Sequence, residues 1–264
     1  MEAQNINAKI NYNKLLDVLF ESWIESYDEK DRERFCHDGL MRKNSSELDI
    51  NELWHNAKRR VMFILKDCPD GWGYDTRDLL QQQDVNELRH GKFFSNLAKL
   101  FYGILRNQAD DRWNDKRVDA DMQNVIKAWQ TEPFAFIEAK KLAGDKNVSK
   151  QEMEIALKHD ESFLKKELDI LKPNIIVCCG ADDSQFDFIT KCVFANKTPQ
   201  ILGSQDYPSK SSPSCLHYYP EDEVAVIKSY HPSAIKEEWM ILERVFSPFS
   251  SLLHNYETPF LQLH

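Results

Sequence analysis

The amino-acid sequence predicts an α/β protein of three layers, α/β/α, in which helices cover both faces of a mostly parallel central sheet. Short continuous apolar runs, typical of strands buried on both faces, occur at residues 61–65, 133–137, 174–180 and 224–227. Between them, apolar residues recur at three- and four-residue spacing, which is typical of amphipathic helices. Apolar strands that alternate with such helices favour a parallel sheet covered on both sides.

Residues 1–60 are expected to be a helical segment packed on a main domain of residues 61–264. Within residues 7–59 the apolar positions follow helical spacing: Ile10, Leu15, Leu16, Leu19 and Trp23. The first strand follows, and the Pro and two Gly of residues 66–75 predict a loop at its end.

The middle of the chain predicts one helix, one exposed loop and one strand. The helix is marked by apolar residues at helical spacing: Phe94, Leu97, Phe101 and Ile104. Residues 107–121 are strongly polar and are expected to form an exposed loop. The second strand, 133–137, is expected to lead into a polar loop that reaches Gly144.

The clearest helix signal begins at Ser149, which forms an S-x-x-E capping box with Glu152. Pro173 closes this helix and the third strand follows. The fourth strand ends at residues 229–233, and a last helix is marked by four apolar residues: Trp239, Leu242, Val245 and Phe246.

Ligands of parallel sheets bind beyond the carboxyl ends of the strands. The loops expected there are 66–75, 138–148, 180–187 and 229–234. We therefore expect these four loops to lie together at one edge and to carry the chemistry.

The composition excludes several functional classes. Lys and Arg number 34 and Asp and Glu number 43, a net charge of −9, which argues against a broad basic surface for duplex DNA but leaves room for a small basic groove. No apolar run is long enough to cross a bilayer, and the N-terminus lacks a signal-peptide pattern. The six cysteines contain no C-x-x-C pair. We therefore expect a cytoplasmic protein with reduced thiols, no membrane partner, no cofactor and no metal.

Four sequence phrases carry a resemblance to a known family: LKPNIIVCCG, SYHPS, KDCPDGWGYD and FAFIEAKKLAG. In the order in which they occur along the chain, KDCPDGWGYD, FAFIEAKKLAG, LKPNIIVCCG and SYHPS, they resemble the motifs of the uracil-DNA glycosylase superfamily, over roughly residues 61–250. The resemblance implies the three-layer fold and excision of a flipped damaged or modified base from DNA, in repair or in phage defence. It also implies DNA, single-stranded or with an everted base, as the partner.

The chain departs from that family at two positions. Cys68 precedes the Pro of the first motif, where many members have an Asp, and Asp67 lies one residue earlier. Glu138 stands where the family usually has a base-reading Asn.

The resemblance implies two catalytic residues. His231 would donate a hydrogen bond to the departing base, and Asp67 would position water or stabilise the positive sugar. Simpler interpretations stay open: His231 could satisfy backbone groups of its own turn, and Asp67 could be an Asx-type turn residue.

Three further residues would contact the base. Trp72 and Tyr74 could stack on it, or could pack their own loop. An ionised Glu138 only accepts hydrogen bonds, so it would favour the N4 amine of cytosine over uracil. Glu138 could instead pair with a neighbouring lysine on a solvated loop.

Phosphates would be held by Ser233, Lys140 and Lys141, although a lysine-rich run is also typical of a solvated loop. The alternative to an enzyme is a non-catalytic protein of the same fold. Such a protein would bind a nucleotide, nucleic acid or protein partner in the same crevice.

Overall fold

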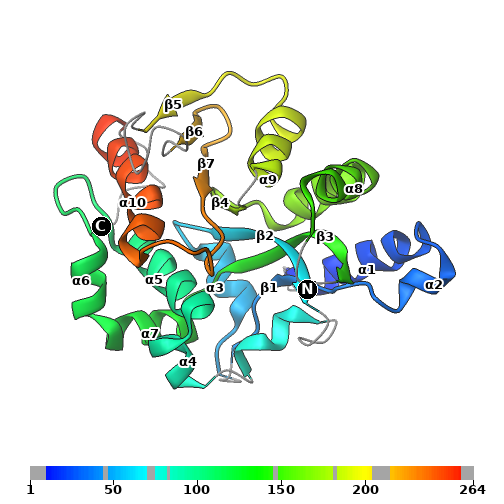
Figure 1. Cartoon of the computed structure of the whole chain (residues 1–264), viewed down its shortest axis with the longest axis horizontal. Helices are drawn as coiled ribbons and strands as arrows, with labels where there is room; N and C mark the ends of the chain where they lie inside the picture. Colours follow the sequence, from blue (N-terminus) through cyan, green and yellow to red (C-terminus); the bar gives the residue numbers. More distant parts are fainter. Residues whose placement is uncertain are drawn as a thin grey trace, which may run out of the picture.

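The computed structural model describes residues 10–43, 47–69, 75–81, 84–144, 148–180, 183–203 and 215–256. Within them the chain forms a seven-stranded mixed sheet with the strand order β1-β3-β2-β4-β7-β6-β5. Helices pack on both faces of this sheet (Figure 1). The predicted α/β class is therefore confirmed.

The centre of the sheet is parallel and its flanks are antiparallel. The four parallel strands, adjacent in the order β3-β2-β4-β7, are β2 (Val61–Pro69), β3 (Ala135–Gly144), β4 (Ile175–Cys179) and β7 (Val224–Ser229). The antiparallel strands are β1 (Gly39–Leu40) against β3, β6 (Leu216–Tyr219) against β7, and β5 (Gln200–Leu202) against β6. The expectation of a mostly parallel sheet thus holds for the centre alone.

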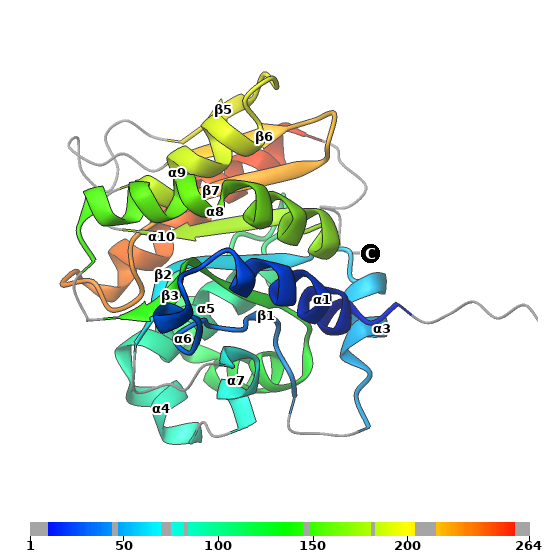
Figure 2. The ribbon, with the colours of Figure 1, turned by 90° about the vertical axis from the view of Figure 1, so that its right-hand side faces the viewer.

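One face of the sheet is covered chiefly by α5 (Lys92–Arg106), α7 (Met122–Thr131) and α10 (Glu238–Asn255). The shorter η2 (Thr76–Gln81), α4 (Val85–His90) and α6 (Asp115–Ala120) lie in the same part of the chain. The other face is covered by α1 (Tyr12–Glu25), α8 (Lys150–Leu171) and α9 (Ser184–Phe188), which are turned toward the viewer in Figure 2. The remaining elements are α2 (Glu29–Arg32), α3 (Ile50–Asn56) and a π-helical turn, η3 (Ile189–Val193).

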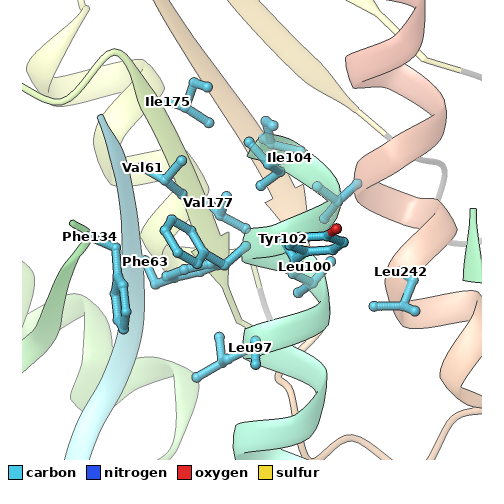
Figure 3. Packing of buried hydrophobic residues seen from close by; sticks show 14 of the residues in the cluster. Val61, Phe63, Leu97, Leu100, Tyr102, Ile104, Phe134, Ile175, Val177 and Leu242 are labelled. Carbon is cyan, nitrogen blue, oxygen red and sulfur yellow. The ribbon is translucent and has the colours of Figure 1, made fainter. Parts of the chain in front are cut away.

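Strand alternation divides the core into two halves. Val61, Phe63 and Leu65 of β2 point to the α5 side, whereas Met62 and Ile64 point to the α8 side. Figure 3 shows the first half, where Val61 and Phe63 face α5, and Leu242 approaches α5 from α10. The capping box of α8 is present, with the Ser149 side chain and the Glu152 side chain each bonded to the other's backbone N–H.

Three expectations about local structure are wrong. Residues 107–121 are not all loop, because Asn114 caps α6 within them. Residues 138–144 continue β3 instead of forming a loop. The N-terminal segment is not only helical, since residues 39–40 add the edge strand β1 to β3. Polar residues hid α6 and the second half of β3, and the pairing of β1 with β3 joins residues almost 100 positions apart.

Among the residues that the structure describes, no helix is both long and apolar enough to cross a membrane.

Candidate functional site

The carboxyl ends of the four parallel strands lie at one edge of the sheet, as their parallel pairing requires. Asp67 of β2 is in register with Lys140 of β3, and Cys179 of β4 is in register with Ser229 of β7. Strand alternation puts Asp67 and Glu138 on the α5 face, two residues beyond Leu65 and Phe136 respectively. Several predicted site residues are therefore brought to one edge.

Glu138 is the most deeply buried of them. Its side chain is 0% exposed, and neither carboxyl oxygen has a hydrogen-bond partner within the described part of the chain. Burial raises the pKa of Glu138 well above its usual range, and the nearby Cys68, Asp38 and Asp67 add to this effect. The predicted solvated loop around Glu138 is thus wrong, and its surroundings favour the neutral form of the carboxyl.

Lys141 is also buried, in an ion cluster on the opposite side of β3. Its ammonium lies 2.6 Å from both carboxyl oxygens of Asp38 and 2.8 Å from Oε2 of Glu167, and all three side chains are 0% exposed. Burial lowers the pKa of Lys141, but the two carboxylates outweigh it and raise that pKa overall. Lys141 therefore cannot contact a phosphate, and its expected phosphate-binding role is wrong.

Lys140 stays at the surface of the same edge, close to Asp67. Its ammonium is 3.6 Å from Oδ2 of Asp67, whose side chain is 11% exposed. Gly144 leaves room for the Lys140 ammonium beside Asp67. A Cβ at position 144 would lie only 2.9 Å from Lys140 Nζ, and it would also lie 3.5 Å from an Arg34 guanidinium nitrogen and 3.8 Å from Asp67 Oδ2. The Lys140 ammonium thus lies beside the Asp67 carboxylate, and the Arg34 guanidinium, which donates to the Ala143 carbonyl, lies near the same end of β3.

Arg34 belongs to the N-terminal segment and reaches this site because residues 34–36 run antiparallel along the end of β3. The Cys36 N–H donates to the Lys141 carbonyl and the Ala143 N–H donates to the Arg34 carbonyl, both at 2.8 Å. Sequence reasoning missed Arg34, since no local motif signals a backbone pairing over this distance.

His231 follows β7 and is half-buried. The Ser233 N–H donates to His231 Nδ1 at 3.3 Å, and the Ser233 hydroxyl lies 2.8 Å from the same nitrogen. Nδ1 is therefore an acceptor, and in the neutral ring the proton must be on Nε2. Burial, with a contribution from the positive charge of Lys66, lowers the pKa of His231 to about 4.

The His231 turn is fixed to the start of α5. Asn96 Nδ2 donates to the Pro232 carbonyl at 2.6 Å, and the Phe93 ring lies 5.6 Å from the His231 ring and 6.5 Å from the Phe136 ring. Phe93 is the aromatic residue that links His231 to the strand bearing Glu138. The adjacent Phe93 and Phe94 could have indicated an aromatic contact at this site, but only Phe94 fits the helical spacing of apolar residues from which the helix was predicted.

No known protein-family model matches this chain, and no curated protein resembles its sequence significantly. The structure itself establishes an α/β fold with a mixed seven-stranded sheet.

The other predicted residues fall into two groups. Trp72 and Tyr74 lie outside the described residues. Ser233 is exposed, and both its N–H and its hydroxyl face His231, so its observed role is to orient that ring. Within the described ranges, no group of three or more His, Cys, Asp or Glu side chains could hold a metal ion.

Proposed function

We propose that this protein is a DNA glycosylase that hydrolyses the N-glycosyl bond of a flipped base at the carboxyl edge of the sheet. The observation that carries the proposal is the neutral His231, whose Nδ1 is occupied by Ser233 and whose Nε2 is left to donate. A base that departs as an anion needs such a donor, and a neutral donor does not have to compete with water for a proton.

The chemistry assigns separate roles to His231 and Asp67. The bond between the sugar C1′ and the base nitrogen breaks, and its electron pair leaves with the base, where the His231 Nε2–H donates to the anion. The Asp67 carboxylate stabilises the positive sugar and orients the water that adds to C1′. The added water then loses one proton, which passes through solvent to the base anion, and the products are an abasic sugar and the neutral free base.

The state of Glu138 changes the expected base preference. A neutral carboxyl offers one O–H donor and one C=O acceptor, as an amide does, whereas an ionised carboxyl only accepts. The argument that Glu138 must favour cytosine over uracil rested on ionisation, which the burial of this side chain opposes. In our proposal Glu138 pairs with the N3–H and O4 of a uracil-type base once the side chains that cover it move aside.

Three cations near the edge would hold the DNA backbone: Arg34, Lys66 and Lys140. Lys140 lies beside Asp67, Arg34 lies near Gly144 at the same end of β3, and Lys66 is close enough to His231 to lower its pKa. They replace the fully buried Lys141 in the proposed phosphate contacts.

The test is the formation of abasic sites in a panel of oligonucleotides that carry uracil, other damaged bases and modified cytosines, as single strands and as duplexes. We expect at least one base to be released, and uracil-type bases to be released at least as fast as cytosine-type bases. His231→Ala should slow release of every base by roughly 10²–10³-fold, the usual effect of removing one such donor. His90→Ala, an exposed histidine of α4, is the matched control and should leave the rate unchanged.

Two results would overturn the proposal. One is the absence of abasic sites with every base in the panel. The other is activity that His231→Ala leaves intact.

A further inference from the structure

A cavity lies at the opposite edge of the sheet from the proposed excision site, where β2, β4 and β7 begin. It has a volume of about 890 Å³ and lies between the end of α3, the end of α8 and the turn η3. This volume is in the range of small-molecule sites, roughly 300–1,000 Å³. None of the residues proposed for base excision lines it.

Three cations on this cavity stand out in an acidic protein. Lys58, Arg60 and Lys172 line it, and none of the three forms an ion pair with a carboxylate within the described ranges. A fourth cation, Lys197, is already used, because its ammonium lies 3.3 Å from Asp222 and 3.7 Å from Glu221. Asp169 and Glu223 also line the cavity.

Arg60 is held in place by its backbone and by one side-chain nitrogen. Its side-chain Nε donates to the Lys172 carbonyl at 2.7 Å, and its backbone N–H donates to Asn174 Oδ1 at 2.7 Å. Asn174 Nδ2 in turn donates to the Lys58 carbonyl at 2.6 Å. The terminal nitrogens of the guanidinium keep their donors for a ligand, and an oriented guanidinium is suited to a phosphate or carboxylate.

The backbone at this cavity is strained. Lys172 has φ 48° and Glu223 has φ 54°, which are two of the three positive φ values among the non-glycine residues that the structure describes. Lys172 is the left-handed C-cap of α8, a position that glycine usually fills. Strained residues concentrate at functional sites, and both Lys172 and Glu223 line this cavity.

We propose that this cavity binds an organic phosphate of nucleotide size. The phosphate group would lie against Arg60, Lys58 and Lys172. The body of the ligand would lie against Val193 and Phe194, and Asp169 and Glu223 would accept hydrogen bonds from its hydroxyl or amino groups. The proposal does not depend on base excision, because the two sites occupy opposite edges of the sheet.

The first test is isothermal titration calorimetry of the full chain with AMP, adenosine and inorganic phosphate. We expect AMP to bind with a dissociation constant below about 1 mM, and adenosine and inorganic phosphate each to bind at least tenfold more weakly. If AMP does not bind, the site is wrong. If adenosine binds as tightly as AMP, the cations do not hold a phosphate.

Variants separate binding from folding. Arg60→Ala should weaken AMP binding by about tenfold or more, since it removes charge-assisted hydrogen bonds, but it also removes the bond to the Lys172 carbonyl. Lys172→Gly is the more informative variant, because glycine adopts the left-handed region without steric strain. We expect Lys172→Gly to weaken AMP binding severalfold while its melting temperature stays the same or rises.

The control is Lys158→Ala, an exposed lysine of α8 that does not line the cavity, and AMP binding should not change. An alternative is that Lys172 only offsets the dipole at the C-terminus of α8. In that case Lys172→Gly would lower the melting temperature and leave AMP binding unchanged, and this result would overturn the proposal.

Discussion

Three buried acidic residues near β3 interact with the same buried lysine. Asp38, Glu138 and Glu167 are all buried, and Lys141 is the ammonium that interacts with each of them. Three carboxylates with one ammonium would leave surplus negative charge in a region of low dielectric constant, which is costly. Burial accordingly raises the pKa values of both Glu138 and Glu167. Both shifts favour protonated carboxyls, which would reduce the surplus negative charge around Lys141.

Glu138→Gln should make the stability of the protein less dependent on pH. The pKa of Glu138 is raised in the folded state, so above about pH 4.3 the folded chain keeps a proton that the unfolded chain has lost. The free energy of unfolding therefore falls as pH rises through the window between the unfolded and the folded pKa. We expect the wild-type slope between pH 5 and 8 to be steeper than the variant's by up to about 1.4 kcal/mol per pH unit.

Urea denaturation at several pH values measures this difference. Glu154→Gln, at a surface position of α8, is the matched control and should keep the wild-type slope. Parallel pH profiles for wild type and Glu138→Gln would show that Glu138 is ionised in the folded protein.

The sequence placed His231 correctly just after a strand, but Glu138 lies within β3 and not at its end, and the surroundings of Glu138 and Lys141 were misjudged. The phrase EAKK in β3 has the polarity of a loop, and polar residues there predict solvent. Lys141 is buried because Asp38, from the N-terminal segment, supplies its counter-charge across 103 positions of the chain. No local pattern could predict a pairing of that separation.

At the scale of elements, the candidate site depends on how closely α5 packs against α10. Gly103 of α5 faces Phe246 of α10, and a Cβ at position 103 would lie 2.1 Å from that ring. The first turn of the same helix carries Phe93 and Asn96, which contact the His231 turn. The position of α5 therefore links the packing of the core to the geometry of the site.

Gly103→Ala should destabilise the protein, although the same change usually stabilises a helix by up to about 1 kcal/mol. The added methyl group collides with Phe246, and overpacking of this kind costs about 1–3 kcal/mol. Thermal unfolding measures the effect. Gly103→Ala combined with Phe246→Leu should recover part of the lost stability. If the double variant is no more stable than Gly103→Ala, the collision with Phe246 is not the cause of the destabilisation.

The sequence predicted the long elements and missed the short ones for a physical reason. The Ser149 capping box and the apolar runs of β2, β4 and β7 are local signals, and all four elements are present. The two-residue strand β1 is held by its pairing with β3, so its own residues carry little signal. Arg34 reaches the site through the same kind of long-range pairing.

At the scale of the whole molecule, the charge distribution predicts weak and moderately salt-dependent binding to DNA. The chain has a net charge of −9, and the proposed backbone contacts are Arg34, Lys66 and Lys140. Three phosphate contacts on duplex DNA give a slope of about −3 for log K against log salt. Fluorescence anisotropy of a labelled duplex measures this slope, and a value of about −8 or steeper would reveal a much larger basic face.

The place of β1 in the sheet also has a consequence for synthesis on the ribosome. Helix α1 and β1 emerge first, yet β1 pairs with β3, and Trp23 of α1 donates to Asp160 of α8 at 2.8 Å. Until those later elements have been made, the apolar side of α1, with Leu16, Phe20 and Trp23, has no partner to cover it. A nascent chain with such an exposed face is prone to aggregate. Helix α1 therefore reaches its native contacts only after β3 and α8 have been translated.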